Sequence, residues 1–277
     1  MCTWGTATPL PLHHLPPPYA ELVPVPSLET AERLLSFGSV LVVEIRDPVR
    51  DWPLVVESLP LLRRRFPAVP HALWVPGGGG STLLELARRA GQWGVRAVLV
   101  AEGPHADALR RSLAHPVDLG GQVVEWLELI DVRLTPRTRE LGRLIIDRAG
   151  AYRRIGELLA AIRWSERSAR YQMRKRRLAP PERWFGVARA LGAALRLQAD
   201  TRSSATRLAM EMGYGGHSGL SRLFARTFGL TVPTVRSIAG WEPLMMRALS
   251  LLVPYLGDRV SDSAVRDRRG NFAALRF

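Results

Sequence analysis

The sequence predicts an α/β N-terminal domain with a parallel sheet, followed by an all-α C-terminal domain. Up to about residue 116, apolar strand patterns alternate with amphipathic helix patterns, which is typical of βαβ units. After Gly120 and Gly121 the strand patterns stop and helical periodicity continues alone. The excess positive charge lies in this helical part: residues 136–240 hold 21 basic residues against 7 acidic ones, whereas residues 1–135 hold 12 against 14. A basic block of this kind favours a polyanionic partner, most often nucleic acid.

In the first domain, residues 1–18 are rich in proline and we expect them to be irregular. The α/β domain is expected over 19–120. Apolar runs predict its strands within 20–25, 40–45, 71–75 and 95–101. Amphipathic patterns predict the intervening helices at 27–38, within 53–66, from about Thr82, and at 104–114.

The remainder of the chain is expected to be helical. We assign 121–135 to a linker helix, 136–240 to the second domain, and 241–277 to a last helix and a polar, disordered tail. Helical periodicity places the helices of this part at 122–131, 136–149, 152–161, 165–177, 181–199, 203–212, 217–228, 232–239 and 242–252.

The stretch EMGYGGHSGLSRLFARTF, residues 211–228, contains a sharp turn between two of these helices. Gly213 suits the left-handed residue that ends a helix. The second helix buries one apolar face, and the first buries Ala205, Leu208, Ala209 and Met212. This stretch has the helix-turn-helix pattern: a short helix, a glycine turn, and a second helix with a polar, basic outer face. The predicted buried residues of the second helix are Leu220, Leu223, Phe224 and Phe228, and the predicted exposed ones are His217, Ser218, Ser221, Arg222 and Ala225.

A similar pattern precedes it by about fifty residues. Its first helix directs Ile155, Leu158, Leu159 and Ile162 inward, and Ser165 is a suitable N-cap for its second helix. That second helix buries Ala169 and Met173, and its expected outward residues are Arg167, Arg170, Tyr171 and Arg174. Between the two patterns, one continuous helix is expected over 181–199. Nineteen residues span roughly 28 Å, close to the roughly 34 Å between successive major-groove faces, so a monomer could read a long site.

These residues resemble a known family. RWSERSARYQMRKRRLAPPERW, followed by SSATRLAMEMGYGGHSGLSRLFARTFGLTVPTVR, is similar to the double helix-turn-helix domain of AraC/XylS transcription regulators, over about residues 150–238. Gly215, Gly219 and Pro233 depart from that pattern. The resemblance implies a double-stranded DNA partner, action on RNA polymerase, and a homodimer as one possible state. It assigns DNA contacts to Arg167, Arg170 and Tyr171 in the first unit and to His217, Ser218, Ser221 and Arg222 in the second. The outward Arg174 of the first unit is a further DNA-binding candidate.

Structural roles remain alternatives for these side chains. Arg222 could form an intradomain salt bridge, Arg167 and Arg170 could be solvated charges, His217 could cap its helix, and Tyr171 could fill the core.

The N-terminal domain weakly resembles the receiver domain of response regulators. In that alignment the strand at 40–45 would end at the phosphorylated aspartate, and Glu44 occupies or neighbours the place. We expect the first strand of such a domain to be absent or replaced, the first acid is Glu21, and residues 1–135 contain no lysine. Without carboxylates to hold Mg²⁺, we expect a degenerate, unphosphorylated receiver-like domain. A generic α/β domain is the alternative.

No catalytic site, cofactor or metal site is indicated by the sequence. The glycine run Gly77–Gly80 lacks the lysine of a phosphate-binding loop, so a surface loop is favoured over an enzyme's nucleotide site. The six histidines have no metal-ligand spacing. No apolar run reaches membrane-spanning length, no secretory signal is recognised, and the lone Cys2 fits a reducing cytoplasm. The best hypothesis is a cytoplasmic transcription regulator, and a non-specific nucleic-acid-binding or scaffold protein is its rival.

Overall fold

The α/β and all-α layout expected from the sequence is confirmed. The computed structural model describes residues 2–4, 23–25, 30, 33–35, 39–45, 48–75, 80–92, 94–100, 105–200 and 202–256. These residues divide into two compact units. Unit 1 contains the described residues up to Pro116 together with Ser237–Pro243, and unit 2 contains Val117–Arg236 and those from Leu244 onward.

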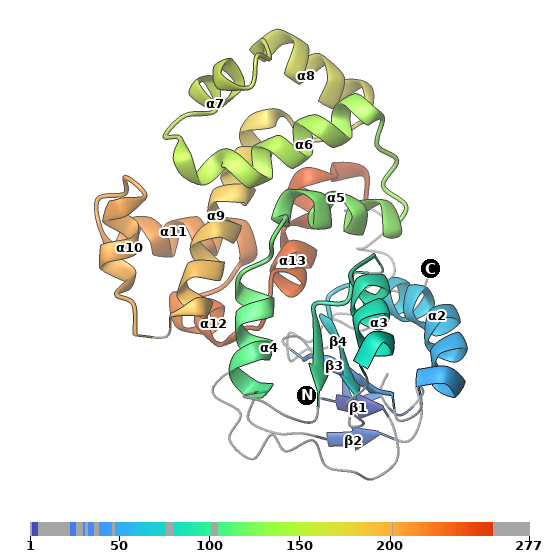
Figure 1. Ribbon diagram of the computed structural model, residues 1–277. Coiled ribbons are helices and arrows are strands. Elements are labelled where there is room, and N and C mark those ends of the chain that lie inside the picture. The colour runs from blue at the N-terminus through green and yellow to red at the C-terminus, as the bar shows by residue number, and fades with distance from the viewer. Residues whose placement is uncertain are drawn as a thin grey trace. The chain divides into compact units, whose positions relative to one another are not determined.

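Unit 1 is built on a five-stranded, parallel sheet with strand order β2-β1-β3-β4-β5 (Figure 1). This is one of the two common strand orders of doubly wound sheets. The strands are β1 Cys2–Trp4, β2 Val23–Val25, β3 Leu41–Glu44, β4 His71–Val75 and β5 Ala97–Val100.

Strand β1 corrects two sequence-based expectations. It lies in the Pro-rich leader, 1–18, which was expected to be irregular, and it is the strand that looked absent before β3. The leader's prolines begin only at Pro9, so the three residues of β1 keep the backbone N–H groups that a ladder needs. The remainder of 1–18 lies outside the described residues.

Three helices of unit 1 are described, and their apolar residues form a core on each face of the sheet. Leu41 and Val43 of β3 pack in a cluster with residues of α2 Pro48–Arg65 and α3 Gly80–Gln92. Val40 and Val42 enter a second cluster with Leu109 and Leu113 of α4 His105–Ala114. Neighbouring residues of a strand point to opposite faces, so the buried run at 40–45 serves both layers. Helix α3 begins at Gly80, two residues before the start expected near Thr82.

A segment from far along the chain completes the second cluster. Ala239 is buried among these residues, and Trp241 and Glu242 are buried beside it. The Arg96 guanidinium lies 3.3 Å from the Glu242 carboxylate and 5.7 Å from the centre of the Trp241 ring. The boundary predicted at 240/241 falls inside Ser237–Pro243, a segment that packs within unit 1.

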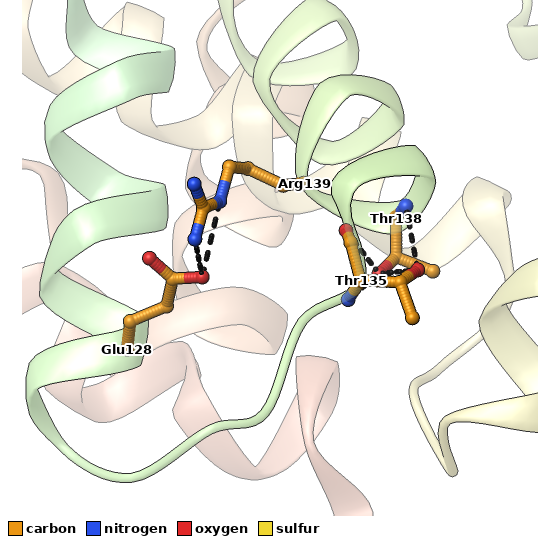
Figure 2. Close-up of polar contacts among 4 residues, drawn as sticks. All are labelled: Glu128, Thr135, Thr138 and Arg139. Carbon is orange, nitrogen blue, oxygen red and sulfur yellow. Dashed lines mark hydrogen bonds and ion pairs between the residues drawn. The ribbon is translucent and has the colours of Figure 1, made fainter.

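Unit 2 consists of helices in its described part (Figure 1). Helix α5 was expected to be a linker, but it packs on α6: the Gly120 N–H donates to Asp147 Oδ1 at 2.7 Å, and Glu128 pairs with Arg139 (Figure 2). Thr135 caps α6 through reciprocal bonds with Thr138. The helices are α5 Leu119–Leu129, α6 Pro136–Arg148, α7 Ile155–Ala161, α8 Glu166–Lys175, α9 Pro181–Ala199, α10 Ala205–Glu211, α11 His217–Phe228, α12 Val232–Ser237 and α13 Glu242–Leu252. A 3₁₀ turn covers Ala149–Ala151. The last residue of α12 and the first two residues of α13 belong to unit 1.

Candidate nucleic-acid interface

Helix α8 presents a basic face to solvent. Ser165 caps its N-terminus, accepting the Ser168 N–H at 3.1 Å, as the sequence predicts. Ala169 and Met173 are fully buried, and they anchor the opposite face. Tyr171 is 50% exposed, so the core-filling alternative for it is wrong. All four outward residues predicted from the helical spacing are exposed, namely Arg167, Arg170, Tyr171 and Arg174.

The helix before α8 is held by a local network. Glu157 Oε2 accepts the backbone N–H groups of Arg153 and Arg154, which satisfies two donors at the start of α7. Leu158 and Leu159 are buried. The chain then turns through Arg163, which adopts a left-handed conformation with φ of 59°. The turn between α7 and α8 is therefore short and well defined, although it contains no glycine.

Arg170 is the most constrained of these exposed arginines. Its Nε donates to Glu182 Oε1 at 2.8 Å, and its Nη2 donates to the same oxygen. Glu166, one turn earlier on α8, lies 3.3 Å from Nη2. The hydrogen bond to Glu182, with the charges of both carboxylates, raises the pKa of Arg170. The alternative reading of Arg170 as a free, solvated charge therefore does not hold, because two carboxylates pair with it. Within the described residues, no carboxylate partner is found for Arg167 or Arg174.

Helices α10 and α11 form a second pair of the same kind. Ser204 caps α10 and accepts the Arg207 N–H at 3.4 Å. Gly213 ends the helix with φ of 79°, as predicted, and Gly216 has φ of 122°. Both angles favour glycine, so the glycines permit the tight reversal from α10 into α11. The connection consists of Met212–Gly216, only five residues.

The two faces of α11 also agree with the sequence analysis. Leu220, Leu223, Phe224 and Phe228 are buried, and the two phenyl rings lie 5.9 Å apart. His217, Ser218 and Arg222 are exposed on the other side, and Ser221 is partly buried between them. His217 Nδ1 and Ser221 Oγ are hydrogen-bonded at 3.2 Å. His217 therefore has a side-chain partner within its own helix.

Arg189 connects the two helix pairs, and sequence reasoning did not identify it. This residue of α9 is only 8% exposed. Its Nη1 donates to the carbonyls of Tyr152 (2.9 Å) and Arg153 (3.2 Å) before α7, and its Nη2 donates to the Met212 carbonyl after α10. Its guanidinium also lies 5.0 Å from the centre of the Tyr214 ring. The sequence did contain a signal for this buried role, because Arg189 lies among the apolar residues of the helix at 181–199.

Helix α9 itself has the predicted bounds, 181–199: Pro181 is its first residue and Pro180 is its N-cap. Helices α7 and α8 lie beside its N-terminal half, while α10 and α11 lie towards its C-terminal end (Figure 1). Near that end the buried Gln198 donates to the Val235 carbonyl of α12 at 3.3 Å. One long buried helix therefore supports both pairs, with Arg189 near its middle.

The other candidate sites gain no support. The described residues contain no group of His, Cys, Asp and Glu that could hold a metal ion. Of the glycine run, Gly80 begins α3, and Gly77–Gly79 lie outside the described residues. None of the described helices combines the length and the apolarity needed to cross a membrane. The polar tail expected to be disordered falls largely at 257–277, also outside the described residues.

Comparison with known proteins yields no match to a protein-family model, a curated protein or a solved structure.

Proposed function

We propose that this chain is a sequence-specific DNA-binding transcription regulator of the AraC/XylS type. In this proposal α7–α8 and α10–α11 are helix-turn-helix units, and α8 and α11 are their recognition helices. The observation that carries the proposal is that each pair buries one face of its second helix and exposes a polar or basic one. A helix of this kind can enter the major groove with its N-terminal residues against base edges.

The charge distribution supports the same partner. The exposed arginines of α8 are followed directly by Lys175, Arg176 and Arg177, which are also exposed. Clustered cations of this kind neutralise phosphates and release counterions. Double-stranded DNA is therefore the proposed ligand, and RNA polymerase is the partner through which a regulator of this type would act.

For unit 1 we propose a regulatory or dimerising role as a degenerate receiver-like domain. Its strand order, β2-β1-β3-β4-β5, is the order of flavodoxin and of receiver domains, which supports the resemblance. The residues that follow β1 in the sequence are Gly5 and Thr6, where a receiver domain would supply Mg²⁺-binding carboxylates. This composition supports a domain that is not phosphorylated.

A second candidate function is non-specific nucleic-acid binding or a scaffold role. The exposed arginines favour it, since phosphate contacts need no base readout. The two proposals differ in one measurable property, which is discrimination between a selected duplex and its scrambled version.

Competition binding at several salt concentrations tests the proposal. Arg222→Ala removes an exposed cation from α11. We expect it to weaken binding to selected and scrambled duplexes alike and to lower the salt slope by roughly one, as the loss of a phosphate contact would. Arg88→Ala is the matched control, since it removes an exposed arginine from α3 of unit 1. Equal affinity of the parent for both duplexes would favour the non-specific alternative.

A further inference from the structure

The network around Arg170 suggests how α8 reads DNA. A guanidinium has five N–H donors in a rigid fork. Glu182 uses the Nε hydrogen and one Nη2 hydrogen of Arg170, because both nitrogens donate to its Oε1. The outer edge consists of Nη1 and the second Nη2 hydrogen; Glu182 does not use it, and Glu166 approaches it at Nη2, at 3.3 Å. That outer edge has the geometry that binds guanine O6 and N7 in a bidentate manner.

The local charge favours a base over a phosphate for this group. Arg170, Glu166 and Glu182 together carry one positive and two negative charges, all on exposed side chains. A phosphate would be repelled by the two carboxylates. A base edge carries no net charge, so it does not suffer this repulsion.

The network also restricts the side chain before DNA binds. A free arginine on a helix surface samples many rotamers and loses that freedom when it binds. Glu182 belongs to α9, whereas Arg170 belongs to α8, so the contact fixes the guanidinium relative to both helices. An arginine held in this way loses less entropy per base contact.

We propose that Arg170 reads a guanine in the major groove and that Glu182 is the positioning residue that holds its guanidinium for this contact. The inference rests on the proposed function, and it adds the identity of one base and the role of a carboxylate. Glu182 touches Arg170 and contributes to base recognition only through it.

The test begins with selection of duplexes from a randomised library by the full chain. The parent and Arg170→Ala are both selected, and the position whose guanine preference disappears in the variant identifies the contact. At this position guanine is then replaced by 7-deazaguanine, which lacks the N7 acceptor. We expect the parent to lose affinity roughly tenfold, within the range of bidentate base contacts, and Arg170→Ala to show no loss.

Two substitutions of Glu182 separate positioning from charge. Glu182→Gln removes the charge but keeps an oxygen that can accept from Arg170, whereas Glu182→Ala removes both. We expect both variants to bind the 7-deazaguanine duplex more tightly than the parent, because a negative charge is gone. Only Glu182→Ala should lose most of the discrimination against 7-deazaguanine. A role in charge alone predicts the same discrimination for both variants.

Glu128→Gln and Glu128→Ala are the matched controls. Arg139 donates through Nε, at 3.1 Å, and through Nη2 to a single oxygen of Glu128, in the same geometry but between α5 and α6 (Figure 2). These variants should discriminate as the parent does.

Two outcomes would overturn the inference alone: a selected site with no guanine that depends on Arg170, or a Glu182→Ala variant that discriminates like the parent. A parent chain that enriches no sequence at all would instead refute the proposed function.

Discussion

Replacement of Arg189 by methionine tests whether this buried arginine holds the two helix pairs together. Methionine keeps a long, flexible stem but removes the three hydrogen bonds to the carbonyls of Tyr152, Arg153 and Met212. Arg153 is exposed, so its carbonyl can bind water in the variant, whereas Tyr152 and Met212 are half-buried. The loss therefore comes from the two bonds to Tyr152 and Met212. Hydrogen bonds to a charged donor contribute about 1.5 kcal/mol each at the low end, which gives about 3 kcal/mol for these two.

The ring contacts of the guanidinium with Phe185 and Tyr214 add about 1 kcal/mol together. The buried Arg189 guanidinium has no carboxylate partner among the described residues, so its burial costs free energy. The variant no longer buries this charge and regains about 1–2 kcal/mol. We therefore expect Arg189→Met to lose about 2–3 kcal/mol of unfolding free energy in unit 2.

Amide hydrogen exchange measures this loss locally. The N–H groups of Gly213 and Tyr214 donate to Met210 and Ala209, so they report on the turn between α10 and α11. Their protection should fall about 30- to 150-fold, the equivalent of 2–3 kcal/mol. Arg196→Met on the same helix is the control: this arginine is exposed and pairs with Glu211, and its loss should cost less than about 1 kcal/mol. Equal protection in both variants would refute the role assigned to Arg189.

Three further predictions concern unit 1. Burial, with a smaller effect of the Arg63 charge, lowers the pKa of His71 from 6.5 to about 3. Below pH 6.5 the unfolded chain therefore binds a proton that the folded chain does not, and unit 1 should lose about 2 kcal/mol of unfolding free energy between pH 7 and pH 5. Urea unfolding should show this loss in the parent and in a variant of the exposed His115, but not in His71→Leu. Glu242→Gln breaks the buried ion pair with Arg96 and should lower the unfolding free energy of unit 1 by about 2–4 kcal/mol. Denaturant unfolding measures this loss as a lower midpoint, and an unchanged midpoint would show that Ser237–Pro243 does not stabilise this unit. Incubation with a small phosphodonor should leave the mass of the chain unchanged, and one added phosphoryl group on an acid of unit 1 would contradict the degenerate receiver-like assignment.

Local patterns predicted unit 2 well because its helices carry their own boundary signals. Ser165 and Ser204 have the side-chain oxygen that caps a helix, and Gly213 tolerates the left-handed backbone that ends one. Helical spacing then separates the buried from the exposed residues of α8 and α11, since the buried residues of each helix lie on one face. These signals lie within a few residues of the features that they determine.

The errors came from contacts between distant parts of the sequence. Strand β1 has only three residues, and its place in the sheet depends on pairing with Val23–Val25 and Leu41–Val43. The insertion of Ala239 into the core beside α4 depends on a segment more than a hundred residues away. The environment of Arg189 likewise needs two turns that lie about sixty residues apart in the chain. No periodicity within a single element encodes such contacts.

The measurement that tests the central claim most directly is a map of the sites that the full chain occupies across the genome of its host. The proposed function predicts discrete sites that share one sequence motif and lie beside transcription starts, and substitution of Arg222 should reduce their occupancy. Occupancy spread along the genome without a shared motif, or no occupancy of DNA at all, would contradict it.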